Sequence, residues 1–192
     1  MSSVGIYGGT FDPIHTGHLI TALTVKEIRS LEKIIFIPAF VSPLKTGESH
    51  SDASHRFEML NLAIKDIPGF ESSDIEIKRD SVSFTIDTLT TLKEKYNKIE
   101  LIIGYDNLLV FEKWKNPDEI FRLADIVVLK RISDIIPEKN RFFNKVSFVN
   151  TPVIEISSTE IRQRVKNNLP INFFIPELVH EYINKHKLYK DK

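Results

Sequence analysis

The residues best suited to chemistry lie near the N-terminus, where Gly8-Gly9-Thr10 is followed by His15 and His18. Two glycines directly after an apolar run let the backbone approach a ligand that any Cβ would obstruct. Histidines three residues apart on the opening turn of a helix present both imidazoles on one face, near the positive end of the helix dipole. Backbone amides, imidazoles and a threonine hydroxyl suit a cluster of anionic oxygens, so this segment predicts a polyphosphate site.

Other interpretations of the same segment stay open at this point. A glycine pair after a strand is often an ordinary turn, and His15 and His18 would also suit a metal pair or an exposed helix face. A zinc site needs a third protein ligand, for which only Asp12 is near. A dinucleotide-binding loop is disfavoured because Gly-x-Gly-x-x-Gly is absent.

A second polar segment lies near the other end of the chain, where Ile156-Ser157-Ser158-Thr159 leads into a helical pattern that contains Arg162. Serine and threonine are favoured where a helix begins, because their oxygens accept hydrogen bonds from free backbone amides. Helix capping alone explains the segment. The same helix start, with an arginine one turn later, would equally suit a bound phosphate.

The elements that must position these residues alternate along the chain, as is typical of a parallel α/β sheet. Apolar runs predict strands at residues 4–7, 34–37, 75–77, 99–103, 126–129, 146–149 and 153–156. The runs at 34–37 and 126–129 are apolar throughout, as expected of strands covered by helices on both faces. We therefore expect an α/β fold with a doubly wound parallel sheet.

Longer periodic stretches predict helices at residues 17–31, 54–65, 84–96, 108–114, 117–123, 159–167 and 176–186. In the second of these, Phe57, Leu60 and Ile64 have the spacing of a buried helical stripe. The connections 38–53 and 131–145 are longer than usual and are candidates for functional loops. We expect one domain over residues 1–192, with a C-terminal helical portion from about residue 157 packed on it.

Composition limits the function classes. The chain has 192 residues with 26 basic and 26 acidic side chains, so no strong net field favours long nucleic acids or anionic membranes. The absence of cysteine excludes disulfides and thiolate chemistry. No apolar stretch approaches the roughly 20 residues that span a bilayer, and no leader pattern opens the chain. The expectation is a soluble cytoplasmic protein.

Together, the two polar segments resemble the two signatures of a known enzyme superfamily. Gly-Gly-Thr-Phe-Asp-Pro-x-His-x-Gly-His, at residues 8–18, resembles the signature of the His-x-Gly-His nucleotidylyltransferase superfamily. Ile-Ser-Ser-Thr-Glu-Ile-Arg, at residues 156–162, resembles the second signature of its adenylyltransferases. Class I aminoacyl-tRNA synthetases carry Lys-Met-Ser-Lys-Ser there, which this chain lacks. The resemblance implies a Rossmann-like nucleotidylyltransferase fold.

By this resemblance the two segments form one ATP site. The implied ATP-binding residues are Gly8, Gly9, Thr10, Phe11, His15, His18, Ile156, Ser157, Ser158, Thr159 and Arg162. The implied catalytic residues are His15 and His18, which would bind the transferring phosphate, with Lys45 and Arg162, which would offset negative charge. We expect no metal ligands from the protein, because Mg²⁺ keeps several waters and can arrive with ATP.

Between the two signatures the chain resembles bacterial nicotinate-nucleotide adenylyltransferases, at residues 56–59, 83–89, 103–108 and Trp114, and again from residue 174 onward. The resemblance implies transfer of AMP from ATP to nicotinate mononucleotide, the two partners of the protein. The implied mononucleotide-binding residues are Asp12, Lys45, Thr85, Gly104, Asp106 and Trp114. Trp114 is the only tryptophan and can stack on a pyridine ring, although a core position is the alternative.

One departure from the family pattern concerns the first long loop. Pro43-Leu44-Lys45 stands where the family usually has Pro-His-Lys, so His50 or His55 would have to supply the missing imidazole unless both are solvated loop residues. Arg131 is likewise not followed by the usual Pro-Gly. Alternatives are a phosphopantetheine or nicotinamide mononucleotide adenylyltransferase, and a nucleotide-sensing protein without catalysis. The sequence leaves the oligomeric state open, a homo-oligomer included.

Overall fold

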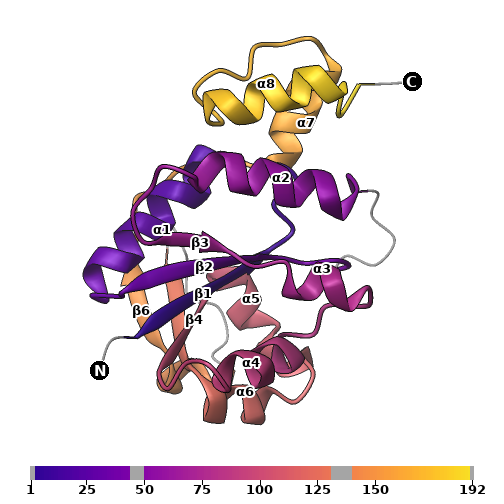
Figure 1. The fold of residues 1–192 in the computed structure, drawn as a ribbon. Coiled ribbons are helices and arrows are strands. Elements are labelled where there is room, and N and C mark those ends of the chain that lie inside the picture. The colour runs from indigo at the N-terminus through magenta and orange to yellow at the C-terminus, as the bar shows by residue number, and fades with distance from the viewer. Residues whose placement is uncertain (1–2, 44–49, 131–139, 191–192) are drawn as a thin grey trace.

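A six-stranded sheet runs through the middle of the molecule with helices on both faces (Figure 1). The computed structural model describes residues 3–43, 50–130 and 140–190. The strands are β1 (Val4–Gly9), β2 (Lys33–Pro38), β3 (Phe70–Ser72), β4 (Ile99–Gly104), β5 (Asp125–Lys130) and β6 (Ser147–Asn150). Their order is β3-β2-β1-β4-β5-β6, and all neighbours pair in parallel. The predicted doubly wound parallel sheet is confirmed.

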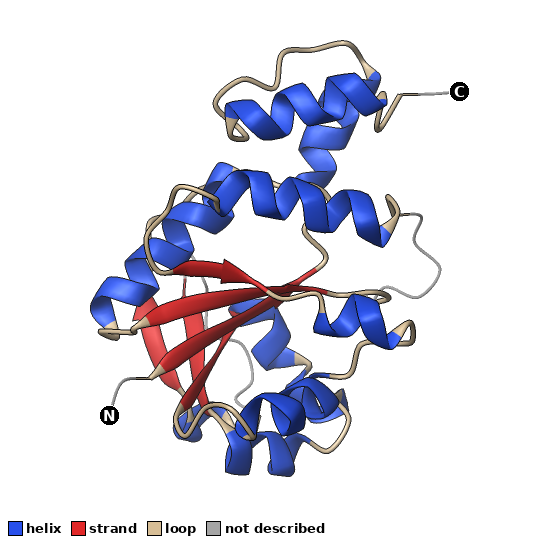
Figure 2. Cartoon of the chain, viewed as in Figure 1, coloured by secondary structure: helices blue, strands red, loops and turns tan. Residues whose placement is uncertain are grey.

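The helices are α1 (Thr16–Ile28), α2 (Ala53–Ile64), α3 (Ile75–Arg79), α4 (Thr85–Lys93), α5 (Tyr105–Leu109), α6 (Pro117–Leu123), α7 (Ser158–Lys166) and α8 (Glu177–His186), and short 3₁₀ turns lie at Phe111–Lys113 and Phe143–Lys145. Figure 2 shows the strands as a layer between the helices. In β2, Ile34 and Phe36 join the core beneath α1 and α2, whereas Ile35 and Ile37 join the core beneath α4 and α6. Side chains that alternate between two covered faces explain why this strand is apolar throughout.

The C-terminal helices extend one of these two layers. Helix α8 lies beside α2 (Figure 1), and its Val179 and Ile183 are buried in the same core as Met59 and Leu60 of α2. Of the predicted stripe on α2, Leu60 and Ile64 are buried and Phe57 is half-buried. None of the helices in the described ranges is long and apolar enough to cross a membrane.

The strand order places a topological switch point between β1 and β4. The chain moves from β1 outward to β2 and β3, and then returns to the other side of β1 as β4. In such sheets the crevice outside the carboxyl ends of the two central strands is the usual ligand site. Gly8 and Gly9 end β1 and Gly104 ends β4, so three predicted site residues lie at this crevice.

Two predicted strands are wrong. Residues 75–77 belong to helix α3, in which Glu76 is buried and Ile75 and Ile77 are half-buried, and the third strand is formed earlier, by β3. The run at 153–156 forms no strand, because β6 pairs with β5 only as far as Asn150. Pro152, which lacks a backbone donor, follows at once.

One predicted helix is divided. Residues 108–114 contain the end of α5 and a 3₁₀ turn, Phe111–Lys113, with Val110 between them outside helical geometry. Both helical pieces are short, and each buries one apolar side chain, Leu108 and Phe111. The loop segments at 44–49 and 131–139 lie outside the described residues, and with them Leu44, Lys45 and Arg131.

Candidate active site

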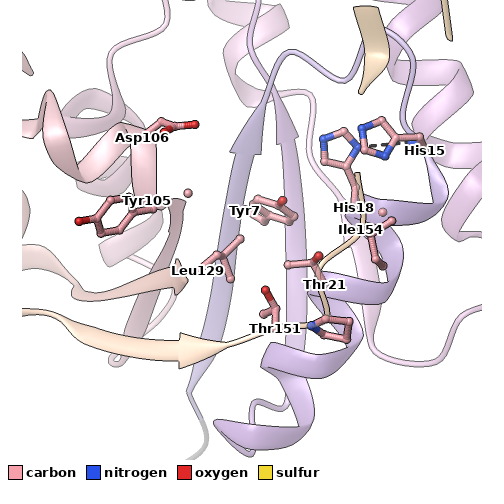
Figure 3. A pocket seen from close by; sticks show the side chains of 12 residues that line it. Tyr7, His15, His18, Thr21, Tyr105, Asp106, Leu129, Thr151 and Ile154 are labelled. Carbon is pink, nitrogen blue, oxygen red and sulfur yellow. Dashed lines mark hydrogen bonds between the residues drawn. The ribbon is translucent and has the colours of Figure 1, made fainter. Parts of the chain in front are cut away.

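His15 and His18 stack on one another at the start of α1. Their ring centroids lie 3.7 Å apart at an interplanar angle of 28°. The backbone N–H of His15 donates to Nδ1 of His18 over 3.3 Å, which places His18 within the cap of the helix (Figure 3). The two imidazoles therefore lie side by side at the positive end of a helix dipole, as predicted.

The surroundings of His18 fix its charge and its tautomer. Desolvation by burial, followed by the proximity of His15, lowers the pKa of His18 well below its usual value. The ring is therefore neutral at neutral pH. Since Nδ1 accepts a hydrogen bond, the single proton lies on Nε2, where it can be donated to a ligand oxygen.

A smaller cavity of about 170 Å³ opens between α1 and the ends of β4 and β5. Figure 3 shows the side chains that line it. The lining consists of Tyr7, His15, Gly17, His18, Thr21, Gly104, Tyr105, Asp106, Leu129, Thr151, Pro152 and Ile154. Asp106 was predicted to share a mononucleotide site with Trp114; in the structure Asp106 lines this smaller cavity, whereas Trp114 does not.

A larger cavity of about 460 Å³ adjoins the glycine-rich end of β1. Its lining includes Gly8, Gly9, Thr10, Phe11, His18, Glu76, Ser83, Thr85, Thr88, Gly104, Trp114 and Ser158. Thr85 and Trp114 are therefore brought together with the phosphate-binding segment, although they are far from it in sequence. Tyr7, His18 and Gly104 line both cavities, so the two spaces meet at His18.

Trp114 has one covered face and one unsatisfied polar atom. Its ring packs against Phe111 with centroids 4.8 Å apart, and its Nε1 is buried without a hydrogen-bond partner among the described residues. A buried indole N–H usually finds an acceptor. The ring packs against the core and also lines the larger cavity, so stacking on a pyridine stays a prediction.

The second motif forms the start of α7 beside the first motif. The Ser157 hydroxyl accepts from the backbone N–H of Glu160 over 3.1 Å and so acts as the predicted N-cap. The Ser158 hydroxyl donates to the carbonyl of Pro13 over 2.9 Å. Ile156 packs at the edge of the core and lines neither cavity.

Arg162 joins the two motifs directly. Its guanidinium donates to the carbonyl of Asp12 over 2.8 Å and to the exposed Thr159 hydroxyl over 3.2 Å. The side chain is half-buried, so it retains an accessible surface for an anionic ligand. Arg162 lines neither cavity, but the tertiary structure brings residues from near both ends of the chain together in one corner, for which the sequence predicted phosphate binding.

Asp12 does not line either cavity. Its carboxylate is 2% exposed, accepts from the Tyr189 hydroxyl over 2.7 Å and from the Ser51 N–H over 3.1 Å, and lies 3.6 Å from Nδ1 of His50. The geometry therefore disfavours the predicted contact between Asp12 and the mononucleotide, because both carboxylate oxygens already accept hydrogen bonds from the protein.

The two histidines considered as replacements for the missing loop imidazole also face the protein. His50 lies against Asp12, and Nδ1 of His55 lies 2.9 Å from the Tyr182 hydroxyl. Neither lines either cavity. Lys45, predicted to neutralise phosphate charge, lies outside the described residues.

Sequence reasoning missed a buried carboxylate in the larger cavity. Glu76 is 8% exposed and accepts from the Thr88 hydroxyl over 2.7 Å. Desolvation raises the pKa of Glu76, opposed by hydrogen bonds from Thr88 and Ser83 and by the charge of Arg79. The apolar-polar-apolar pattern at residues 75–77 did not predict the burial of Glu76, because in a strand Glu76 would point away from its two apolar neighbours.

The parallel sheet, with two motifs brought together at its switch point, is typical of a nucleotidyltransferase. The family model described as "Cytidylyltransferase-like" matches residues 6–164, and the chain belongs to this family. Within it, the predicted resemblance to nicotinate-nucleotide adenylyltransferases is confirmed by the sequences of full-length relatives.

Two relatives and one solved structure illustrate the similarity. A protein of Hydrogenobaculum sp. (strain Y04AAS1) named "Probable nicotinate-nucleotide adenylyltransferase" is 41% identical over 187 residues, which cover 97% of each chain. A protein of the same name from Clostridium beijerinckii (strain ATCC 51743 / NCIMB 8052) is 41% identical, covering 99% of this chain and 100% of its own. The Plasmodium falciparum nicotinic acid mononucleotide adenylyltransferase complexed with NaAD shares the fold, with a TM-score of 0.81 at 22% identity over 98% of each chain.

Proposed function

We propose that the protein transfers the AMP moiety of ATP to nicotinate mononucleotide, giving nicotinate adenine dinucleotide and pyrophosphate. The observation that carries this proposal is the meeting of two cavities at His18, with Tyr7 and Gly104 as the other shared walls. A reaction that joins two nucleotides needs both to reach one centre in fixed orientation. The names of the relatives, which cover nearly the whole chain, support the choice of substrates.

ATP is assigned to the corner formed by the two motifs and to the smaller cavity, which His15 and His18 also line. The start of α1 supplies His15 and His18, the start of α7 supplies Ser158, and Arg162 adds a permanent positive charge. Helix N-termini and a guanidinium together favour a chain of phosphates. Magnesium enters as part of the substrate, MgATP, with its remaining ligands supplied by phosphate oxygens and water.

Nicotinate mononucleotide is assigned to the larger cavity. The Trp114 ring offers a surface for the pyridine, its free Nε1 offers a donor, and the Thr85 hydroxyl lies on the same wall. Stacking of this kind typically contributes about 1 kcal/mol beyond the burial of apolar area. The mononucleotide phosphate then points towards His18, where the two cavities meet.

The chemistry is an in-line displacement at phosphorus. An oxygen of the mononucleotide phosphate forms a bond to the α-phosphorus of ATP, and the bond from that phosphorus to the bridging oxygen breaks as pyrophosphate leaves. The attacking phosphate is largely ionised near neutral pH, so the protein needs to supply no strong base. Neutral His18 donates from Nε2 to a phosphate oxygen, and Arg162 offsets charge on the departing pyrophosphate.

The direct test is to incubate the protein with MgATP and one acceptor at a time and to follow pyrophosphate release. The acceptors are nicotinate mononucleotide, nicotinamide mononucleotide and phosphopantetheine. We expect the highest kcat/KM with nicotinate mononucleotide. Turnover of phosphopantetheine but not of either pyridine nucleotide would refute the assignment, and ATP binding without turnover of any acceptor would indicate a sensing protein.

Two variants separate catalysis from folding. His18→Ala removes the donor at the meeting point, so we expect turnover to fall by roughly 10²-fold or more, the usual cost of losing one such donor. His186→Ala is the matched control, because this exposed histidine of α8 packs near His55 and lines neither cavity. Equal activity of the two variants would contradict the role of His18.

The single tryptophan gives an independent binding assay. If Trp114 stacks on the pyridine, nicotinate mononucleotide should quench the intrinsic fluorescence in a saturable manner, whereas ATP alone should not.

We place this activity in the cytoplasm, without nucleic-acid partners, and these points stay predictions from the sequence.

A further inference from the structure

The backbone that carries the catalytic histidines is held largely by the C-terminal part of the chain. We call residues 12–16, which contain His15 and end at the first residue of α1, the histidine segment. At its far end, both the backbone N–H and the hydroxyl of Thr16 donate to the carbonyl of Phe174, over 2.8 and 2.9 Å. In its middle, Pro13 accepts from Ser158 of α7 over 2.9 Å. Residues far apart in sequence therefore fix where His15 lies.

At its near end the histidine segment is held through Asp12, and the donor is the tyrosine that follows α8. The Tyr189 hydroxyl donates to Oδ1 of Asp12 over 2.7 Å, a distance typical of a hydroxyl that donates to a carboxylate. The second oxygen of Asp12 accepts from the Ser51 N–H and lies near His50. Burial, followed by the negative charge of Asp12, raises the pKa of Tyr189, so its hydroxyl stays protonated and remains a donor.

The same aspartate also holds the second motif. The carbonyl of Asp12 accepts from Arg162, the residue assigned to the leaving pyrophosphate. A shift of the Asp12 backbone would disturb Arg162 directly, because Arg162 donates to the Asp12 carbonyl, and would also disturb His15, which lies three residues further along the chain. Since Asp12 is 2% exposed, water cannot replace a lost donor without a rearrangement of the segment.

We propose that Tyr189 is a positioning residue for ATP: its hydroxyl holds Asp12, and through Asp12 it sets the places of His15 and Arg162. Tyr189 touches no substrate in this scheme. The proposal rests on the proposed function only in taking ATP as the ligand of the two motifs. It gives Tyr189 a role in substrate binding although this residue lines neither cavity.

A purely structural tyrosine would behave differently from a positioning one. Loss of a merely structural hydroxyl lowers the melting temperature but leaves ATP affinity unchanged at temperatures where the protein is folded. Loss of a positioning hydroxyl weakens ATP binding in the folded protein. The two roles are therefore separated by measuring ligand binding well below the melting temperature.

The experiment compares Tyr189→Phe with Tyr182→Phe. Each variant removes one hydroxyl from the C-terminal part of the chain, but the Tyr182 hydroxyl faces His55 rather than Asp12. ATP affinity is measured by calorimetry without an acceptor, and kcat and both KM values are measured by pyrophosphate release. We expect Tyr189→Phe to weaken ATP binding about tenfold and to leave the KM for the mononucleotide unchanged. Tyr182→Phe should bind ATP like the wild type.

Two outcomes would overturn the proposal: equal ATP affinity of the two variants, or a rise in the mononucleotide KM alone, which would mean that Asp12 contacts the acceptor. Should Tyr189→Phe not fold, Asp12→Asn tests the same contact from the other side, with the same expected loss of ATP affinity. Where both fold, the double variant should lose little more than either single one, because both break one interaction. ATP binding is measured without an acceptor, so an error in the proposed acceptor would not affect this test.

Discussion

The glycine of the His-x-Gly-His motif gives the sharpest test of the site geometry. A Cβ built on Gly17 would lie 3.1 Å from Nδ1 and 3.2 Å from Cε1 of His15, and 3.4 Å from Cγ2 of Ile154. The first two distances are tighter than ordinary van der Waals contact. Gly17→Ala therefore has to displace the His15 ring by a few tenths of an ångström, and the ring stacked on it, His18, is disturbed as well.

The magnitude follows from two opposing effects. Alanine is favoured over glycine inside a helix by up to about 1 kcal/mol, which in a protein of this size raises the melting temperature by roughly 2–4 °C. The tight contact with His15 subtracts part of this gain. For activity, a 1 Å misplacement can cost about 10²-fold, so a shift of a few tenths should lower kcat about tenfold, or ~1.4 kcal/mol of activation free energy. Stability and activity should thus change in different directions.

The assay pairs thermal unfolding, followed by circular dichroism, with steady-state pyrophosphate release at saturating MgATP and nicotinate mononucleotide. We expect Gly17→Ala to melt at or slightly above the wild-type temperature and to turn over about tenfold more slowly. Wild-type kcat in this variant would refute the reasoning, because it would show that the position of His15 within a few tenths of an ångström does not matter. A large fall in melting temperature would show instead that the ring cannot move.

Three further predictions use other features of the site. Ser157→Ala removes the acceptor for the N–H of Glu160 and should cost about 1 kcal/mol of stability, seen as a lower melting temperature, and should raise the KM for ATP because α7 begins there. Gly104→Ala places a Cβ where, among the described residues other than Gly104 and its two chain neighbours, no atom lies within 4 Å, so the melting temperature should not change. Both KM values should rise, because the methyl enters the space shared by the two cavities; unchanged KM values would contradict that shared space. Because the pKa of His18 is lowered in the folded protein, His18 becomes protonated near pH ~6.5 in the unfolded chain but stays neutral in the folded one. The free energy of unfolding should therefore fall as the pH drops below about 6.5. Urea titrations at several pH values should find a shallower fall in His18→Asn.

The sequence by itself determined the fold class, the ATP-site motifs and the family. Continuous apolar strands such as the one containing Ile34 and Phe36 can be stable only between two helical layers, so the doubly wound sheet followed from local pattern. The glycine pair and the histidine spacing are likewise local, because the site needs a strand end and a helix start that adjoin in sequence. The Ser157 cap is local for the same reason.

Tertiary structure decided which of these residues share a space. The placement of Asp106 with His15, and of Trp114 with the glycine-rich end of β1, depends on the order of strands around the switch point, which pattern alone does not specify. The burial of Glu76 depends on α3 being a helix, a short element whose two apolar residues also fit a strand.

Asp12 shows the difference most clearly. Its position beside two glycines and two histidines suggested contact with substrate, and the local sequence contains nothing to suggest otherwise. The carboxylate is satisfied instead by Tyr189, from nearly the other end of the chain. A short polar side chain in a loop accepts from whichever donor the packing brings near, and that donor is set by how α8 docks on α2, which no local pattern records.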